Sequence, residues 1–273
     1  MMDMTMILGT PDEKPLDRIC HDGGFVGIFR KIACVGDSLA SGEFETVDED
    51  GTKHYHDRFD YSWGQFLARM AGSRVYNFSR GGMTAKGYNE SWAESQGYWD
   101  PALAAHAYIV ALGVNDLLNR GWEIGSEADV CLDDYRKNAY TFAGHFAAIL
   151  QRYRKISPEA KFFLVTMPPQ PEVRAGKEDR IAAHAALMHR FAEMFPGTYV
   201  VDLNAYGPAY DGEEFRRAFF LHGHFTPMGY ALSAKLIVSY IDYIIRHNAA
   251  DFKEIGLLGH EEKLADGVYE TIL

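Results

Sequence analysis

The chain has 273 residues, of which 47% are hydrophobic, and a formal net charge of −11 at pH 7. A chain of this length can form one large α/β domain whose core needs neither disulfides nor a metal. The acidic balance, without any long Lys/Arg run, argues against a nucleic acid or an anionic membrane surface as a partner.

The three cysteines, Cys20, Cys34 and Cys131, are widely spaced and include no CxxC pair. Such usage is typical of free thiols in a reducing compartment. The start, Met1-Met2-Asp3-Met4, lacks the features of a signal peptide, and no stretch approaches the roughly 20 apolar residues of a membrane span. We therefore expect a cytoplasmic protein; the sequence leaves its oligomeric state open.

Residues 1–30 contain several Gly and Pro breakers and are expected to form an extension that wraps the domain. Five short apolar runs follow and predict β-strands. They cover residues 31–35, 74–77, 107–112, 161–166 and 199–203.

Between these runs, apolar residues recur at helical spacing over residues 62–71, 135–153 and 177–195. Thr226 as N-cap and Pro227 as first residue predict a last helix that ends at about residue 247. Alternating strands and helices indicate a parallel sheet covered on both faces. We predict one α/β domain over residues 31–247, with strand order 2-1-3-4-5, and a short appendage over residues 248–273.

Chemically useful residues follow four of the predicted strands. Because parallel strands end at the same edge of a sheet, these residues are expected to lie together. A serine, glycine N–H groups, a side-chain amide and a histidine are the components of acyl transfer. The segments are Gly36-Asp37-Ser38-Leu39, Asn77-Phe78-Ser79-Arg80-Gly81-Gly82, Gly113-Val114-Asn115-Asp116 and Leu221-His222-Gly223-His224-Phe225-Thr226-Pro227.

In their order and separations, over roughly residues 31–247, these segments resemble the motifs of the SGNH (GDSL) hydrolases. The resemblance implies a flavodoxin-like three-layer α/β/α fold and the hydrolysis of carboxylic esters without a cofactor or metal. By position, it implies that Ser38 is the nucleophile and His224 the general base. It also implies an oxyanion hole formed by the Ser38 N–H, the Gly82 N–H and the Asn115 amide. Gly82 is preferred to Gly81 by its five-residue offset from Asn77.

One position departs from the family pattern. An Asp usually stands three residues before the histidine, and Leu221 occupies that place. We expect the Leu221 backbone carbonyl to accept the Nδ1 proton of His224 instead. Two alternatives are a dyad without an orienting group and a carboxylate brought from elsewhere: Asp211, Asp202, Glu213 or Glu214.

The sequence leaves the ester itself open. A short acyl group, such as acetyl, on a carbohydrate or other small molecule is favoured, because no broad apolar lid is visible; a lipase or thioesterase of the same fold is the alternative. Segment 88–99, rich in aromatic residues, is the best candidate for substrate contact.

Other classes of function are weaker. A non-catalytic ligand-binding relative would have little need of Ser38, Asn115 and His224 together. The pairs His222/His224 and His54/His56 lack a third metal ligand at a recognisable spacing. The Gly-x-Ser-x-Gly elbow of α/β-hydrolases is not matched, since position 40 is alanine.

Overall fold

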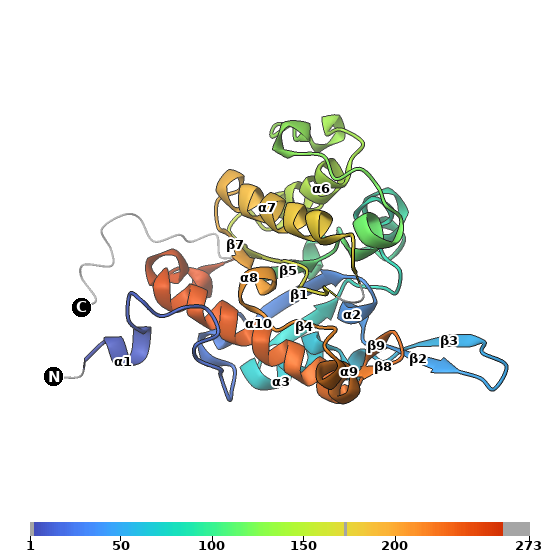
Figure 1. The fold of residues 1–273 in the computed structure, drawn as a ribbon. Helices are drawn as coiled ribbons and strands as arrows, with labels where there is room; N and C mark the ends of the chain where they lie inside the picture. Colours follow the sequence, from blue (N-terminus) through green and yellow to red (C-terminus); the bar gives the residue numbers. More distant parts are fainter. Residues whose placement is uncertain (1–2, 172–173, 259–273) are drawn as a thin grey trace, which may run out of the picture.

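The computed structural model describes residues 3–171 and 174–258, which fold around a five-stranded parallel sheet (Figure 1). The sheet order β4-β1-β5-β6-β7 is 2-1-3-4-5 in chain order, which confirms the predicted topology. The strands are β1 (Lys31–Gly36), β4 (Arg74–Asn77), β5 (Ala107–Ala111), β6 (Lys161–Val165) and β7 (Thr198–Val201).

Helices cover both faces of the sheet, as predicted (Figure 1). On one face pack α3 (Trp63–Ala71) and α10 (Pro227–His247); on the other pack α6 (Phe142–Ile156) and α7 (Glu178–Met194). Successive residues of a strand point to opposite faces. Ile32 and Cys34 of β1 accordingly join the α3/α10 cluster, whereas Ala33 and Val35 join the α6/α7 cluster.

Local capping sets the helix ends. Thr226 Oγ1 accepts the Gly229 N–H, and α10 begins at Pro227 as predicted. The helix predicted over residues 135–153 was wrong at its start, because Tyr135–Lys137 is a separate 3₁₀ turn and α6 begins only after the N-cap Thr141. Between them the Asn138 side chain bonds the Cys131 N–H and the Gly144 carbonyl, which holds the backbone out of a continuous helix.

Two antiparallel ribbons were not predicted. The larger is the hairpin of β2 (Glu43–Val47) and β3 (Lys53–Asp57), which projects from the domain in Figure 1. The smaller pairs β8 (Phe220–Leu221) with β9 (His224–Phe225), and β2 packs against β9. Short helices complete the fold: α1 (Thr5–Leu8), α2 (Ser38–Ser41), α4 (Ala85–Gly87), α5 (Ala93–Ser95), α8 (Leu203–Tyr206) and α9 (Glu213–Phe219).

The N-terminal segment is tied to α10 by buried charges. The Arg246 guanidinium lies 2.7 Å from Glu13 Oε2 and 2.7 Å from Asp242 Oδ2, and Asp242 Oδ1 accepts the Phe25 N–H. Helix α10 is long and apolar enough to span a membrane, but 72% of its most apolar 18-residue stretch is buried inside the fold, as in a core helix. Of the predicted appendage, residues 249–258 pack on the domain through Phe252 and Ile255; residues 259–273, with Leu264, lie outside the described residues.

Candidate active site

Ser38 is the first residue of α2 and is separated from β1 by Asp37 alone. Asp37 caps this helix by accepting the Leu39 N–H at 3.1 Å. As the first helical residue, Ser38 has an N–H without an intrahelical acceptor. This N–H is therefore available to a ligand at the carboxyl edge of the sheet.

The four residues expected to form the site line one cavity. Ser38, Gly82, Asn115 and His224 all border a space of about 570 Å³, although they come from four separate segments of the chain. The cavity is also bordered by Asp37, Leu39, Glu43, Tyr55, Gly81, Val114, Asn119, Gln170, Arg174, Tyr210, Arg216, Phe220 and Gly223.

The turn at Gly81 and Gly82 requires glycine, and the asparagine is held by hydrogen bonds. Gly82 has a φ of +68°, a conformation that favours glycine, and a Cβ added to Gly81 would lie 1.9 Å from Glu43 Oε2. Asn115 Nδ2 donates to the Met83 carbonyl at 3.0 Å, while its Oδ1 accepts from Asn119 at 2.9 Å. These contacts fix the amide plane, so Nδ2 stays on the cavity wall.

His224 lies between two carboxylates of the β2–β3 hairpin. Its Nε2 is 3.1 Å from Glu43 Oε1, and its Nδ1 is 3.3 Å from Glu45 Oε2. The Tyr55 ring of the same hairpin meets the imidazole edge-on, with ring centroids 5.8 Å apart. Among the described residues, Ser38 Oγ makes no hydrogen bond with His224, whose Nε2 faces Glu43.

The surroundings of His224 favour its charged form. Burial lowers the pKa of His224, but hydrogen bonds and negative charge from Glu43 and Glu45 outweigh burial and hold that pKa above its usual value. Burial also raises the pKa of the neighbouring Asp37 to about 6. An imidazole with a carboxylate at each nitrogen is thus stabilised as the imidazolium.

The group that binds Nδ1 differs from the one expected. Leu221, 42% exposed, pairs with His224 across the β8–β9 ribbon, and Nδ1 contacts Glu45 rather than the Leu221 carbonyl. Asp211, an alternative candidate for the group that orients His224, is buried and is not among the residues that line the cavity. Asp202 is used elsewhere, because its two oxygens bond Thr166 and His189.

Sequence reasoning missed Glu43 and Glu45 because it assigned no element to the hairpin. One signal was present: Asp50-Gly51, a dipeptide typical of hairpin turns, separates Phe44-Glu45-Thr46-Val47 from His54-Tyr55. A carboxylate 179 residues from the histidine cannot be assigned to it by any local rule.

The aromatic segment 88–99 does not line the Ser38 cavity. Tyr88 is buried, and Trp99 packs against Tyr153 with ring centroids 4.6 Å apart. Trp92 borders a neighbouring cavity of about 430 Å³ that shares Gly81 and Gly82 with the Ser38 cavity.

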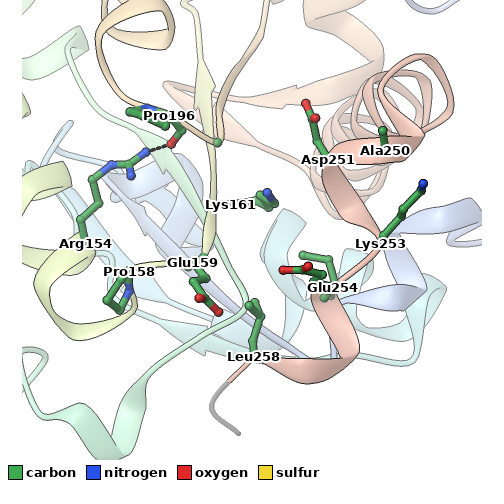
Figure 2. Close-up of a pocket in the computed structure, with 13 residues that line it drawn as sticks. Arg154, Pro158, Glu159, Lys161, Pro196, Ala250, Asp251, Lys253, Glu254 and Leu258 are labelled. Carbon is green, nitrogen blue, oxygen red and sulfur yellow. Dashed lines mark hydrogen bonds between the residues drawn. The ribbon is translucent and has the colours of Figure 1, made fainter. Parts of the chain in front are cut away.

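A further cavity, of about 440 Å³, lies at the amino edge of the sheet, where β6 and β7 begin. Figure 2 shows its charged lining, with Arg154 bonded to the Pro196 carbonyl. No serine or histidine is among the lining residues described for it. The serine and histidine of the acyl-transfer pattern, Ser38 and His224, lie at the opposite edge of the sheet.

The two histidines of the pair His54/His56, considered as metal ligands, bond different side chains. His54 bonds Asp48 at 2.8 Å and His56 bonds Thr46 at 2.9 Å, both on the outside of the hairpin. Within residues 3–171 and 174–258, no group of three or more His, Cys, Asp or Glu side chains is arranged to hold a metal ion.

Solved structures share the fold at low sequence identity. A family two carbohydrate esterase from Clostridium thermocellum, in complex with cellohexaose, is similar with a TM-score of 0.50 and 15% identity, over 88% of this chain and 66% of that one. The enzyme LAE5 from the metagenome of Lake Arreo gives 0.50 and 16%, over 78% of this chain and 96% of that one. A family 2 carbohydrate esterase from Corynascus thermopiles gives 0.50 and 15%, over 79% and 66%.

No curated protein matches this chain significantly. The model of the GDSL-like Lipase/Acylhydrolase family matches residues 34–232, a span that includes Ser38, Gly82, Asn115 and His224. This match confirms the resemblance drawn from the strand-end motifs. The chain belongs to the GDSL-like Lipase/Acylhydrolase family and is a hydrolase that acts on ester bonds.

Proposed function

We propose that the protein is a serine esterase that works through an acyl-serine intermediate, with Ser38 as nucleophile and His224 as general base. The observation that supports it is the convergence of Ser38, Gly82, Asn115 and His224 on one cavity. A nucleophile, a base and oxyanion donors at one site are the minimum needed for acyl transfer.

The first half of the reaction forms the acyl-enzyme. The reaction starts from the neutral imidazole: His224 has released its Nε2 proton to solvent, which ends the contact with Glu43, and keeps the proton on Nδ1. Nε2 then turns to Ser38 and takes the Oγ proton as Oγ attacks the ester carbonyl; such contacts are often long in unliganded sites and tighten on substrate binding. The Ser38 N–H, the Gly82 N–H and Asn115 Nδ2 stabilise the oxyanion, each being worth roughly 10²–10³-fold in rate. The alcohol then leaves with the proton held by His224.

The second half releases the acid. His224 Nε2 takes a proton from water, whose oxygen attacks the acyl carbonyl, and the same three donors stabilise the second oxyanion. When this intermediate collapses, the proton returns to Ser38 Oγ. The cycle thus consumes one water and leaves the enzyme unchanged.

The substrate class we propose is a short-acyl ester, such as an acetyl ester, of a carbohydrate or another small polar molecule. The cavity wall supports this proposal because Asn119, Gln170, Arg174 and Arg216 offer polar groups around the acyl site. Beyond the glycine turn, the adjoining cavity presents Trp92 and Trp122, whose apolar rings can pack against a sugar.

Hydrolysis of aryl esters of increasing acyl length, by wild type and Ser38→Ala, tests the proposal. We expect turnover by wild type with a short-chain optimum, loss of turnover in Ser38→Ala, and covalent labelling of Ser38 by a fluorophosphonate probe. Ser95→Ala, which changes an exposed serine on α5, is the matched control and should keep full activity. Full activity in Ser38→Ala would refute the mechanism, and a long-chain optimum would point to a lipase instead.

A further inference from the structure

Glu45 occupies an unusual place for a charged side chain. The Glu45 side chain is 3% exposed, and Oε2 lies 3.3 Å from His224 Nδ1 and 3.2 Å from the Gly223 N–H. Its other oxygen, Oε1, lies 2.7 Å from Lys53 Nζ. Oε1 is thus ion-paired with Lys53, and Oε2 contacts Nδ1, the imidazole nitrogen that the proposed mechanism does not use as the base.

We propose that Glu45 is the positioning residue of His224 and takes the place of the carboxylate that the chain lacks at Leu221. This inference rests on the proposed function, in which His224 is the base. When the imidazolium loses one proton, Glu45 keeps the remaining proton on Nδ1, and Nε2 is left free to accept one from Ser38. The carboxylate then stabilises the imidazolium formed during attack.

The charge state of Glu45 suits this role. Burial alone would raise the pKa of Glu45, but hydrogen bonds from Lys53 and His224 outweigh it and hold that pKa below its usual value. Glu45 is therefore ionised at neutral pH, although it is almost inaccessible to solvent. Lys53, paired with Glu45 across the hairpin, provides the compensating charge that a buried carboxylate needs.

The β2–β3 hairpin is anchored to the domain close to Glu45. Tyr230 on α10 donates its hydroxyl to the Glu43 carbonyl at 2.6 Å, and Ser41 on α2 donates to Asp57 at 2.7 Å. Gly223 lets the Glu45 carboxylate approach its backbone, because a Cβ at residue 223 would lie 2.6 Å from Glu45 Oε2. The hairpin is thus fixed at its base, where Glu43 pairs with Asp57 two residues from Glu45, and the carboxylate lies against the glycine next to the histidine.

Glu43, on the same face of β2, cannot take this role. It contacts Nε2, the nitrogen that must face Ser38 during attack, so its contact is broken in the reaction. The Glu45 contact on Nδ1 is compatible with every step. Of the two glutamates, Glu45 is therefore assigned the positioning role.

Glu45→Gln tests the proposal, with Asp48→Asn as control. Asp48 is a carboxylate on the same hairpin that also bonds a histidine, His54, but its side chain is 60% exposed and is not among the residues that line the cavity. We expect kcat on an aryl acetate to fall about 10³–10⁴-fold in Glu45→Gln, with KM changed by less than about threefold. Asp48→Asn should retain wild-type values. A kcat in Glu45→Gln within about tenfold of wild type would overturn the proposal.

A second measurement does not depend on turnover. In ¹⁵N NMR of the wild type above the His224 pKa, the proton should reside on Nδ1, and Glu45→Gln should shift this tautomer equilibrium whereas Asp48→Asn should not. A proton on Nε2 in the wild type would overturn the proposal, even if Glu45→Gln fails to fold. Absence of turnover and of Ser38 labelling in the wild type would instead refute the proposed function, while the NMR result still decides the role of Glu45.

Discussion

Glu43→Gln should shift the pH dependence of activity. Glu43 Oε1 lies 3.1 Å from His224 Nε2, and the two side chains are 12% and 13% exposed. Opposite unit charges about 4 Å apart attract by about 1 kcal/mol in water and about 4 kcal/mol at an effective dielectric constant of ~20. For this partly buried pair we take an attraction of about 2 kcal/mol. Since one pKa unit corresponds to about 1.4 kcal/mol, removing the attraction should lower the pKa of His224 by roughly one to two units.

The sign follows from the role of His224 as base. Activity requires the neutral imidazole, so it is lost as pH falls through the pKa of His224. Lowering that pKa moves the loss of activity to lower pH. Of the other groups around the ring, Glu45 and Tyr55 are unchanged, and the raised pKa of Asp37 should fall in the same direction because Glu43 contributes to it.

The assay is kcat/KM for an aryl acetate between pH 4 and pH 9. Its acid limb should move down by one to two pH units in Glu43→Gln, with the plateau retained or increased. Glu49→Gln, an exposed glutamate in the loop of the same hairpin, should leave the profile unchanged. An acid limb that does not move in Glu43→Gln would show that Glu43 does not hold the imidazolium in solution, and the reasoning would be refuted.

Three further changes have defined outcomes. Asn115→Ala removes an oxyanion donor and should lower kcat on the aryl ester by roughly 10²–10³-fold with little change in KM; an unchanged kcat would exclude Asn115 from the oxyanion hole. Arg246→Met leaves Glu13 and Asp242 buried without their partner and should cost about 3–5 kcal/mol in urea unfolding; a loss below about 1 kcal/mol would contradict it. Burial raises the pKa of Asp116 from 3.8 to about 7, so the folded state binds a proton that the unfolded chain has released. Stability should therefore fall as pH rises from about 4 to 7, by on the order of 4 kcal/mol, and Asp116→Asn should flatten this part of the pH–stability curve.

The strands of the sheet could be predicted because each is marked by the residues of its own short segment. Runs such as 31–35 and 161–165 are apolar on both faces, as buried parallel strands must be, and each is bounded by polar or Gly/Pro residues. The start of α10 could be predicted in the same way, since Thr226 and Pro227 specify a helix N-terminus without reference to the rest of the chain.

The hairpin and its carboxylates could not be predicted in the same way. All of β3 is exposed, so β3 carries no buried apolar face that would mark it as a strand. Glu45 reads in sequence as a surface charge, and only the tertiary fold buries it against His224 and Lys53. The ordered strand-end motifs indicated which residues gather at the site, whereas the group that binds Nδ1 depends on a contact across most of the chain.

This separation along the chain has a kinetic consequence. Glu45 and His224 are 179 residues apart, and the Tyr230–Glu43 contact that anchors the hairpin spans 187. Contacts with such long sequence separation require large loops to close and are favoured only after local structure has formed. During refolding, the return of esterase activity should therefore lag behind the recovery of helical circular dichroism, which makes turnover a stricter reporter of the completed fold than secondary structure is.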